Sequence, residues 1–506
     1  MRTINEALDS CHGLISPDPR RWPSVLPLVR WGNFHSFTVG HSFEHVLELG
    51  ATGSGKTSAC IKSVALGMLH AGYGVLFLSA KTSDPEDYYA WAKGAGRENS
   101  VVRFGPAHKL GFNLLEYEMA QGGQLTERAM NIPGILSAIG DIIARDKAER
   151  GDGKIWRQAA EQLLKHAVNV VLLATGKVEM DEVMRVVLAA PASKDEAEKA
   201  TWQRDSACSR RLAEAEDRAL GGGDARAAEL AREYFLQLWP QFPPDTRNSV
   251  LFTFAQVADL CRSEPLHRLF FSRTDFTPEI LTDGAVLVVD APALAGGDLG
   301  KVINGLMRLA VERMTLRRKP DAQARPIAII WDEFQTSVVK ADSEFAALAR
   351  SHRCALVMAT QNVNAVDAVM EEDNARALFG NCRVKLFFAN DDPKTNQYMA
   401  DVVGKWEVEK ESKTTGGKNT NKTKNPQEEY AVPPRMALLL KSGGSEFEGK
   451  VSGILIHGGR KLTKGQPWMK VKFDQDKSNW SPLKLVTGYA GAINWNRPAP
   501  DFRWLR

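Results

Sequence analysis

The fold is decided by the stretch HVLELGATGSGKT, residues 45–57, which continues as a helix-like pattern to His70. His45–Leu49 is a short apolar run typical of a β-strand, and Thr57–His70 has the apolar spacing of a helix. Between them, Gly50–Thr57 matches G-x-x-x-x-G-K-[ST] in the strand–helix context that this motif requires. A second continuous apolar run, Val75–Ser79, is typical of a strand buried on both faces. This order predicts the start of a parallel α/β sheet.

The glycine turn predicts a binding site for nucleotide phosphates. Glycine permits backbone angles that let successive N–H groups point inward at an anion, and the following helix adds its positive N-terminus. We expect Lys56 to reach the β- and γ-phosphates and the Thr57 hydroxyl to hold magnesium, so ATP and Mg²⁺ are the predicted cofactors. The eight-residue match disfavours the alternative, a glycine-rich turn without a ligand. The residues predicted to contact nucleotide are Gly50, Ala51, Thr52, Gly53, Ser54, Gly55, Lys56, Thr57 and Ser58.

Another apolar run, Ile327–Trp331, ends in two acids, Asp332 and Glu333. We expect Asp332 to hold magnesium, directly or through water, and Glu333 to polarise the attacking water. The alternative is a surface pair of acids at a strand end. Asp290 competes for the metal role because it also ends an apolar run (AVLVVD), but Ala291 follows it and no adjacent base is present.

Polar residues next to other predicted strands complete the candidate site. Gln361 ends the run ALVMATQ, where an amide can contact the γ-phosphate or the lytic water; its alternative is to cap the next turn. Arg350 and Arg353 precede that run, and a guanidinium from a neighbouring subunit is suited to stabilising a transferring phosphoryl group. Either arginine alone is otherwise a surface ion pair. Lys81 follows VLFLSA and is a further candidate, with a solvated lysine as its alternative.

Composition excludes several classes of protein. The chain has 506 residues, 43% hydrophobic and 25% charged, which is ordinary for globular domains. Its net charge of +4 is too small to indicate nucleic-acid binding without local clustering. The six cysteines are scattered, which argues against a common zinc site and for a reducing compartment. No apolar run is long enough to span a bilayer and the first residues do not form a signal peptide, so we expect a cytoplasmic protein.

Changes in sequence pattern predict the domain organisation. Strand patterns place a nucleotide-binding domain at residues 43–125 and 270–411, with a proline-broken segment at 1–42 before it. Residues 126–269 have helical spacing and few strand signals, which indicates an inserted all-α domain. The stretch 412–425 has four lysines, no acid and no large apolar residue, so we expect a flexible basic linker at 412–430. Two strand-like runs in 431–506 predict a small C-terminal β element.

With these motifs in hand, the chain resembles the type IV secretion coupling proteins, the conjugative TraD/TraG-type ATPases of the FtsK–HerA branch of RecA-like motors. The matching blocks extend over most of residues 45–470, and their order around a helical insertion is more specific than the glycine motif alone. They are GATGSGKT (50–57), VLFLSAKTSD (75–84), FGPAHKLGFNLLE (104–116), IAIIWDEFQ (327–335), ARSHRCALVMATQ (349–361) and NCRVKLFFANDDPKTNQYMADVVGK (381–405), followed by LLLKSGGSEFEGKVSGILIHGGRKL (438–462).

The resemblance implies a RecA-like P-loop domain with a mainly parallel sheet and an inserted all-α domain. It implies a ring, of six subunits in the family, with nucleotide at the interfaces and DNA in the channel. By position, Lys56 and Thr57 bind nucleotide and magnesium, Asp332 and Glu333 are the metal and base acids, Gln361 is the sensor, and Arg350 matches the interface arginine. Many members begin with transmembrane helices, which this sequence lacks, so any inner-membrane association would be made through a partner, such as a membrane-channel or relaxosome protein.

Three functions compete at this point. The first is an ATP-hydrolysing translocase of DNA or nucleoprotein that contacts backbone phosphates without reading sequence. The second is a nucleotide-binding receptor or adaptor that recruits DNA-processing or secreted proteins without translocating DNA. The small net charge of the chain is compatible with this function. The third, a small-molecule kinase, has no evident use for the interface arginine, the Asp-Glu pair and the helical insertion together.

Overall fold

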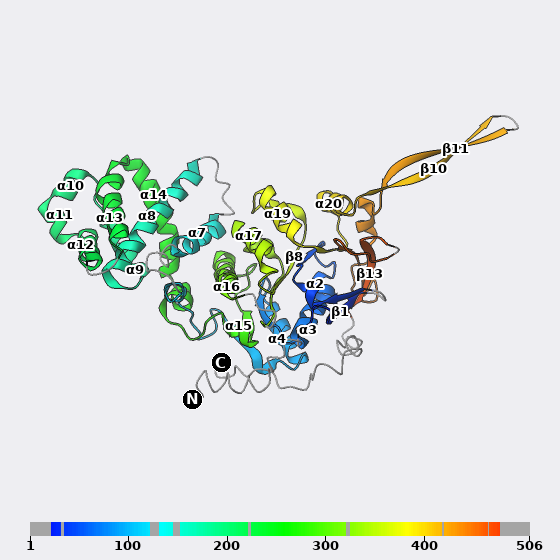
Figure 1. Ribbon diagram of the computed structural model, residues 1–506, viewed down its shortest axis with the longest axis horizontal. Coiled ribbons are helices and arrows are strands. Elements are labelled where there is room, and N and C mark those ends of the chain that lie inside the picture. Colours follow the sequence, from blue (N-terminus) through cyan, green and yellow to red (C-terminus); the bar gives the residue numbers. More distant parts are fainter. Residues whose placement is uncertain are drawn as a thin grey trace.

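The computed structural model describes residues 22–31, 35–121, 131–144, 152–220, 224–319, 324–416, 419–463 and 465–475. Three parts follow one another along the longest axis: a helical unit, a central α/β unit and a projecting hairpin (Figure 1). The α/β unit contains both the glycine turn and the acid strand, so it positions the candidate site.

The central sheet has nine strands in the order β13-β12-β9-β3-β8-β7-β4-β6-β5. Seven of them, from β9 to β5 in that order, pair in parallel, which confirms the predicted mainly parallel sheet. These seven strands are β3 (Val46–Leu49), β4 (Gly74–Leu78), β5 (Val101–Phe104), β6 (Val286–Val289), β7 (Ile327–Trp331), β8 (Cys354–Thr360) and β9 (Val384–Phe387).

Continuous apolar strands form this sheet because helices cover both of its faces. In β4, Val75 and Phe77 belong to one core cluster, while Leu76 and Leu78 belong to the other. The first face is covered by α3 (Lys62–His70) and α4 (Asp84–Gly94). The second is covered by α16 (Gly297–Arg317), α17 (Lys340–Ala349) and α19 (Glu372–Asn381). Three shorter helices and α20 (Pro393–Val403) are further helices of this unit; the short ones are α5 (Leu114–Met119), α15 (Ile280–Asp283) and α18 (Val363–Asp367).

Between α5 and α15 every regular element of the described chain is helical, as the sequence pattern predicts. The helical unit projects away from the sheet (Figure 1). Its longest helix, α8, packs against α12, α14, α9 and α7 and forms the centre of the unit. The helices are α7 (Asn131–Ala144), α8 (Asp152–Thr175), α9 (Met180–Leu188), α10 (Lys194–Glu198), α11 (Ala200–Asp205), α12 (Ala207–Leu220), α13 (Ala225–Glu233) and α14 (Pro244–Arg262).

The two predicted C-terminal strands are present, as β12 (Lys450–His457) and β13 (Trp468–Asp474). They do not form a separate element, because β12 pairs antiparallel with β9 and so extends the central sheet. Without β12, strand β9 would be an open sheet edge with unpaired backbone groups. The central sheet therefore includes residues from the expected extension.

The segment expected to be a flexible linker is part of a β-hairpin, so that prediction was wrong. Strands β10 (Lys405–Gly416) and β11 (Asn419–Tyr430) pair antiparallel along their whole length and form a sheet of their own. An antiparallel ladder needs backbone N–H and C=O groups rather than apolar side chains. A composition argument based on the lack of apolar residues therefore missed it.

Before β3, a short hairpin of β1 (Pro27–Trp31) and β2 (His35–Thr38) lies near α3, against which β1 packs. The short helix α2 (Val39–Ser42) then leads into the sheet. Residues 1–21 and 32–34 of the predicted 1–42 segment, and residues 476–506 of the predicted extension, lie outside the described residues. None of the described helices combines the length and the hydrophobicity needed to cross a membrane.

Candidate functional site

The glycine turn follows β3 directly and leads into a π-helical turn, η1 (Lys56–Ile61), which continues as α3. Gly53 and Gly55 have φ of +76° and +88°, in the region that favours glycine. A β-carbon on Gly55 would also lie 2.5 Å from Cγ2 of Val451 in β12. The turn therefore needs glycine both for its backbone angles and for close packing.

Lys56 folds back over this turn. Its Nζ donates hydrogen bonds to the carbonyl oxygens of Gly50 (2.5 Å) and Ala51 (3.2 Å). Burial lowers the pKa of Lys56, against the opposing effect of the Glu333 and Asp332 carboxylates. A phosphate in the turn would exchange these carbonyls for anionic oxygens, which are stronger partners for an ammonium group.

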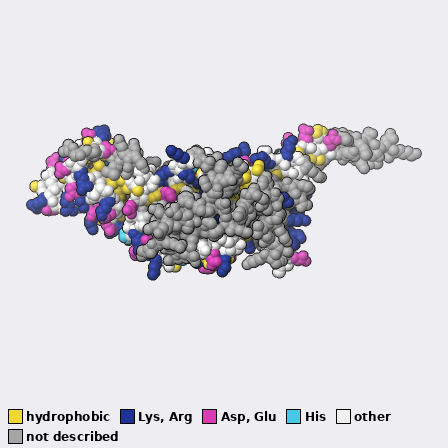
Figure 2. Space-filling model, turned by 60° about the horizontal axis from the view of Figure 1, so that its bottom comes forward, with side chains coloured by type: hydrophobic (Ala, Val, Ile, Leu, Met, Phe, Trp, Pro, Cys, Tyr) yellow, Lys and Arg dark blue, Asp and Glu magenta, His cyan; other side chains and the backbone are white. Residues whose placement is uncertain are grey.

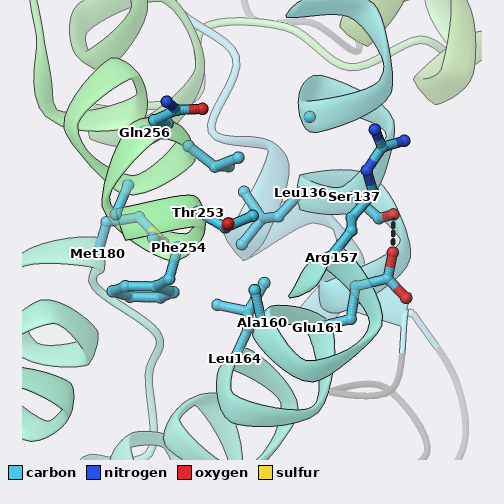
Figure 3. Close-up of a pocket in the computed structure, with 13 residues that line it drawn as sticks. Leu136, Ser137, Arg157, Ala160, Glu161, Leu164, Met180, Thr253, Phe254 and Gln256 are labelled. Atoms are coloured by element: carbon cyan, nitrogen blue, oxygen red, sulfur yellow. Dashed lines mark hydrogen bonds between the residues drawn. The ribbon is translucent and has the colours of Figure 1, made fainter. Parts of the chain in front are cut away.

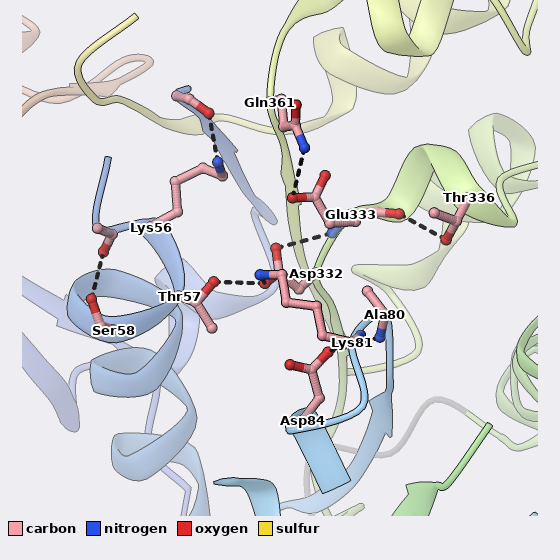
Figure 4. Close-up of polar contacts among 12 residues, drawn as sticks. Lys56, Thr57, Ser58, Ala80, Lys81, Asp84, Asp332, Glu333, Thr336 and Gln361 are labelled. Atoms are coloured by element: carbon pink, nitrogen blue, oxygen red, sulfur yellow. Dashed lines mark hydrogen bonds and ion pairs between the residues drawn. The ribbon is translucent and has the colours of Figure 1, made fainter. Parts of the chain in front are cut away.

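The glycine turn and the acid strand meet at Thr57 and Asp332. The Thr57 hydroxyl donates to Oδ2 of Asp332 at 2.6 Å (Figure 4). These two oxygens suit magnesium, which prefers oxygen ligands and keeps waters or substrate phosphates in its other positions. Among the described residues no group of three or more His, Cys, Asp or Glu side chains is placed to hold a metal. The residues therefore fit a magnesium ion that is bound jointly with nucleotide phosphates.

Glu333 and Gln361 lie beside this pair (Figure 4). Strand β8 runs between β3 and β7, so its end brings Gln361 next to the acids. Gln361 Nε2 donates to Oε1 of Glu333 at 3.4 Å, and Gln335 Nε2 donates to Oε2 at 2.8 Å. Glu333 is 3% exposed, and these two amides hold its carboxylate from two sides.

Lys81 also contacts the acids, at 3.5 Å from its Nζ to Asp332 Oδ2. Burial opposes its charge, but the carboxylates of Asp332, Asp84 and Glu333 outweigh it and raise the pKa of Lys81. Asp84, which the sequence motifs did not single out, accepts the backbone N–H groups of Ala80 (2.8 Å) and Lys81 (2.7 Å). Asp84 thus holds the turn that presents Lys81. Its position three residues after Lys81 is the sequence signal from which this role could have been predicted.

Arg350 lies at the other end of the sheet. It precedes β8, while Gln361 follows it, and a seven-residue strand spans about 20 Å. The Arg350 side chain is 58% exposed, with one guanidinium nitrogen 3.9 Å from Oε1 of Glu44. By contrast, Arg353 is partly buried. Its guanidinium carbon lies 5.4 Å from the centre of the Phe43 ring, and the guanidinium donates to the carbonyl of Trp22. Of the two arginines, only Arg350 presents an exposed side chain.

Two other features lie outside the site. Asp290, the competing acid, directly follows β6, two strands from β7, and pairs with His108 at 2.8 Å. A hollow in the helical unit lies between α7, α8 and α14, with mainly apolar walls and a Ser137–Glu161 hydrogen bond at its rim (Figure 3). Neither contributes a residue to the described contacts around Asp332.

Glu48, in the centre of β3, is an unexpected buried acid. It is fully buried, and among the described residues its carboxylate oxygens meet no N–H or O–H donor; the Cys60 thiol is its hydrogen-bonding neighbour. Burial raises the pKa of Glu48 to about 8, and nearby Asp332 adds to the shift. The sequence offered a signal, because Glu48 interrupts the apolar run HVLEL, but the alternation of a strand could equally have placed it in solvent.

A family model matches part of the chain. Residues 326–438, which include the acid strand, Arg350 and Gln361, match the family model described as the TraM recognition site of TraD and TraG. This confirms the resemblance to the type IV secretion coupling proteins. No curated protein sequence matches the chain.

Solved structures of a coupling protein share the fold. The bacterial conjugative coupling protein TrwBdeltaN70, in its unbound form, aligns over 86% of both chains with a TM-score of 0.57 and 15% identity. The plasmid coupling protein TrwB in complex with ADP and Mg²⁺ aligns over 88% of this chain and 89% of its own, with the same score and identity. TrwB with the non-hydrolysable ATP analogue ADPNP aligns over 87% of this chain and 88% of its own, with a TM-score of 0.55 at 14% identity. The predicted RecA-like P-loop fold is therefore confirmed.

Proposed function

We propose that this protein is a P-loop ATPase that translocates DNA or nucleoprotein as a ring of subunits, a hexamer as in the family that it resembles. The observation that carries the proposal is the 2.6 Å contact between Thr57 and Asp332, which joins the glycine turn to the acid strand. TrwB, whose fold the chain shares, is described with ADP and Mg²⁺ and with an ATP analogue. We infer the same cofactors, ATP and Mg²⁺, for this chain.

Each site residue has a role in this proposal. The Gly50–Ser58 backbone cradles the phosphates, and Lys56 neutralises charge on the β- and γ-phosphates. Thr57 and Asp332 would hold magnesium, which supplies further neutralisation when bound. Glu333 accepts a proton from the water that attacks the γ-phosphorus, and ADP leaves with the displaced electron pair. Gln361 orients Glu333 or the water.

Arg350 requires a second subunit in this proposal. Within one chain it is at the opposite end of β8 from Gln361, too far to contact the phosphates bound at the glycine turn. An exposed guanidinium in that position supports a role at a neighbour's site. Self-association into a ring would bring each Arg350 to the nucleotide of the next subunit.

Mixing two inactive variants tests the shared site. Lys56→Ala removes the phosphate contact and Arg350→Ala removes the arginine, so each alone should lower ATP turnover at least about tenfold. A mixed ring contains some interfaces with an intact Lys56 and an intact Arg350, so mixing should restore part of the activity. Arg435→Ala, outside the described site contacts, is the control. Absence of any restoration in mixed rings verified by light scattering would contradict the trans role.

The translocase also predicts dependence on DNA and on protein concentration. ATP turnover should rise with both, and DNA binding should weaken steeply with salt. We place the protein in the cytoplasm, with any contact to the inner membrane made through relaxosome or channel proteins. A chain that stays monomeric with ATP and DNA would contradict the ring.

The adaptor function has one specific observation in its favour. On the face seen in Figure 2, positive and negative side chains are interspersed over the helical unit, and no large patch of one sign is seen among its coloured residues. The mainly apolar hollow of Figure 3 is the feature of this unit that suits a protein partner. Slow hydrolysis that DNA does not stimulate, together with tight binding of a protein substrate, would favour the adaptor.

A further inference from the structure

The end of β13 reaches the glycine turn from the side opposite the acid strand. In the sheet, β12 and β13 lie beyond β9 on one side of β3, and β7 lies beyond β8 on the other. Gln475, directly after β13, donates from Nε2 to the Ser58 hydroxyl oxygen at 2.6 Å. In β12, Val451 fills the space beside Gly55. The C-terminal strand pair is therefore in contact with the predicted nucleotide-binding residues.

The amide of Gln475 is fixed at both of its ends. Its Oε1 accepts the backbone N–H of Gly444 at 2.8 Å, while Nε2 makes the bond to Ser58. Its own backbone N–H donates to the Gly449 carbonyl at 2.8 Å. Gly443, Gly444 and Gly449 all have positive φ, and a β-carbon on Gly443 would collide with the Gln475 amide. The turn before β12 is thus shaped around this side chain.

This arrangement determines how the Ser58 hydroxyl can act. A hydroxyl has one hydrogen to donate and two lone pairs to accept with. Because Gln475 Nε2 donates to the oxygen, the hydrogen of Ser58 remains for another acceptor. Within the chain its acceptor is the Gly55 carbonyl at 3.5 Å, the outer limit of hydrogen-bond length. A phosphate oxygen carries charge and would be a stronger acceptor than this carbonyl.

We infer that Gln475 is a positioning residue of the nucleotide site, which holds the Ser58 hydroxyl as a hydrogen-bond donor to a nucleotide phosphate. This inference rests on the proposed function. Ser58 directly follows Lys56 and Thr57, whose partners are the β- and γ-phosphates and magnesium, and the glycine-rich loop also cradles the α-phosphate. We therefore assign the Ser58 contact to the α-phosphate, which ATP and ADP share.

Calorimetric titration of the full chain with ATP and Mg²⁺, and separately with ADP and Mg²⁺, tests the inference. Gln475→Ala should raise the Kd of both nucleotides about five- to thirtyfold, as for removal of a hydrogen bond to a charged group. Loss of its hydrogen bonds should lower the melting temperature only slightly, and Kd should change much more than kcat. Ser58→Ala should weaken binding by a similar factor, and the double variant should add little to either single change.

Gln475→Glu separates positioning from structure. The carboxylate keeps the size of glutamine and still accepts the Gly444 N–H, but it cannot donate to Ser58. It would draw the Ser58 hydrogen toward itself, so nucleotide binding should be weaker than in Gln475→Ala. Gln466→Ala, in the turn between β12 and β13 at the other end of the pair, is the matched control.

The outcomes separate the positioning role from the proposed function. A wild-type chain that binds neither nucleotide would overturn the proposed function as well. If the wild type binds and the Gln475 variants bind equally well, only the positioning role is wrong. The positioning role would also be wrong if the increase in Kd followed a fall in melting temperature and was no larger for Gln475→Glu than for Gln475→Ala.

Discussion

At the scale of single residues, Glu333 combines burial with an unusual backbone. Its φ of +48° lies in the left-handed region, which costs a non-glycine residue of order 1 kcal/mol. Its carbonyl accepts the Thr336 hydroxyl at 2.8 Å, and its N–H donates to Asp332 Oδ1 at 3.0 Å. These contacts hold the residue in this conformation and aim its carboxylate at Gln361.

Glu333→Gln should trap nucleotide without turning it over. The amide retains the shape of the side chain but cannot accept the proton of the attacking water, so kcat should fall about 10²- to 10⁴-fold. ATP should still bind, because the glycine turn and Asp332 are unchanged. Single-turnover assays with bound ATP measure both quantities, and Glu344→Gln on the exposed side of α17 is the control. Near-normal turnover would exclude Glu333 as the base.

Glu48→Gln should change how stability depends on pH. The folded-state pKa of Glu48 is raised by burial to about 8, from an ordinary 4.5. Between these values the unfolded chain releases a proton that the folded chain keeps, so the stabilising effect of Glu48 is full below about pH 4.5 and disappears as pH rises to 8. The glutamine of the variant does not titrate, so its stability does not fall with pH for this reason. The melting temperature of the variant minus that of the wild type should therefore rise from pH 5 to pH 8.5. A constant difference across that range would contradict a neutral Glu48.

At the scale of elements, the buried guanidinium of Arg308 joins α16, β7 and α17. It pairs with Glu312 at 2.9 Å and with Asp342, and donates to the Ser337 carbonyl at 3.0 Å. It also stacks on Trp331, the residue before Asp332, with 4.4 Å between the guanidinium carbon and the centre of the ring. The network therefore connects the acid strand to α17, which ends beside Arg350.

Arg308→Met should destabilise the fold by about 3–5 kcal/mol, because it leaves two buried carboxylates without their cation. Chemical denaturation followed by circular dichroism measures the change in the free energy of unfolding. The triple change Arg308→Met, Glu312→Leu, Asp342→Asn should recover part of it, since the uncompensated charges are removed. A decrease below about 1 kcal/mol for Arg308→Met would mean that the network contributes little.

The sequence predicted elements best where local patterns are strong. The glycine turn, the continuous apolar strands and the helical spacing of 126–269 follow from neighbouring residues, so these elements could be predicted. The sequence placed Gln361 at a strand end, as a contact of the γ-phosphate or the lytic water, but it did not predict the contact with Glu333. The contacts of Val451 and Gln475 with the turn could not be predicted, because they depend on β12 pairing with β9, and no local pattern specifies that pairing. The hairpin at 405–430 was missed because its ladder does not require apolar residues.

At the scale of the whole molecule, the β10–β11 hairpin projects from the α/β unit (Figure 1). Among the described strands, these two pair only with each other, and Tyr430 at the base of the hairpin bonds to Gln397 and Asp401 of α20. The core sheet therefore does not depend on the hairpin. The sequence 412–425, which overlaps both of these strands, has four lysines and no acid, which is a local basic charge in a chain of nearly balanced composition.

Changing these lysines, Lys413, Lys418, Lys422 and Lys424, to glutamine should weaken DNA binding and reduce its dependence on salt. Each phosphate that is no longer neutralised should lower the slope of log affinity against log salt by roughly 0.7–0.9. Melting temperature and ATP turnover without DNA should stay unchanged, because the hairpin lies outside the sheet. Titrations of DNA at several salt concentrations measure the slope, and an unchanged slope would exclude the hairpin from the DNA interface.

The pairing of β12 with β9 has a consequence for biosynthesis. Ser58 and Gln475 are 417 positions apart in the chain, so translation produces one long before the other. While a ribosome is still adding the helical unit, β3 and its glycine turn have already emerged, but β9 and β12 do not yet exist. A nascent chain at that point carries an incomplete sheet with exposed strands, which favours chaperone binding or aggregation, and the contacts around the glycine turn are complete only after β12 and β13 have been made.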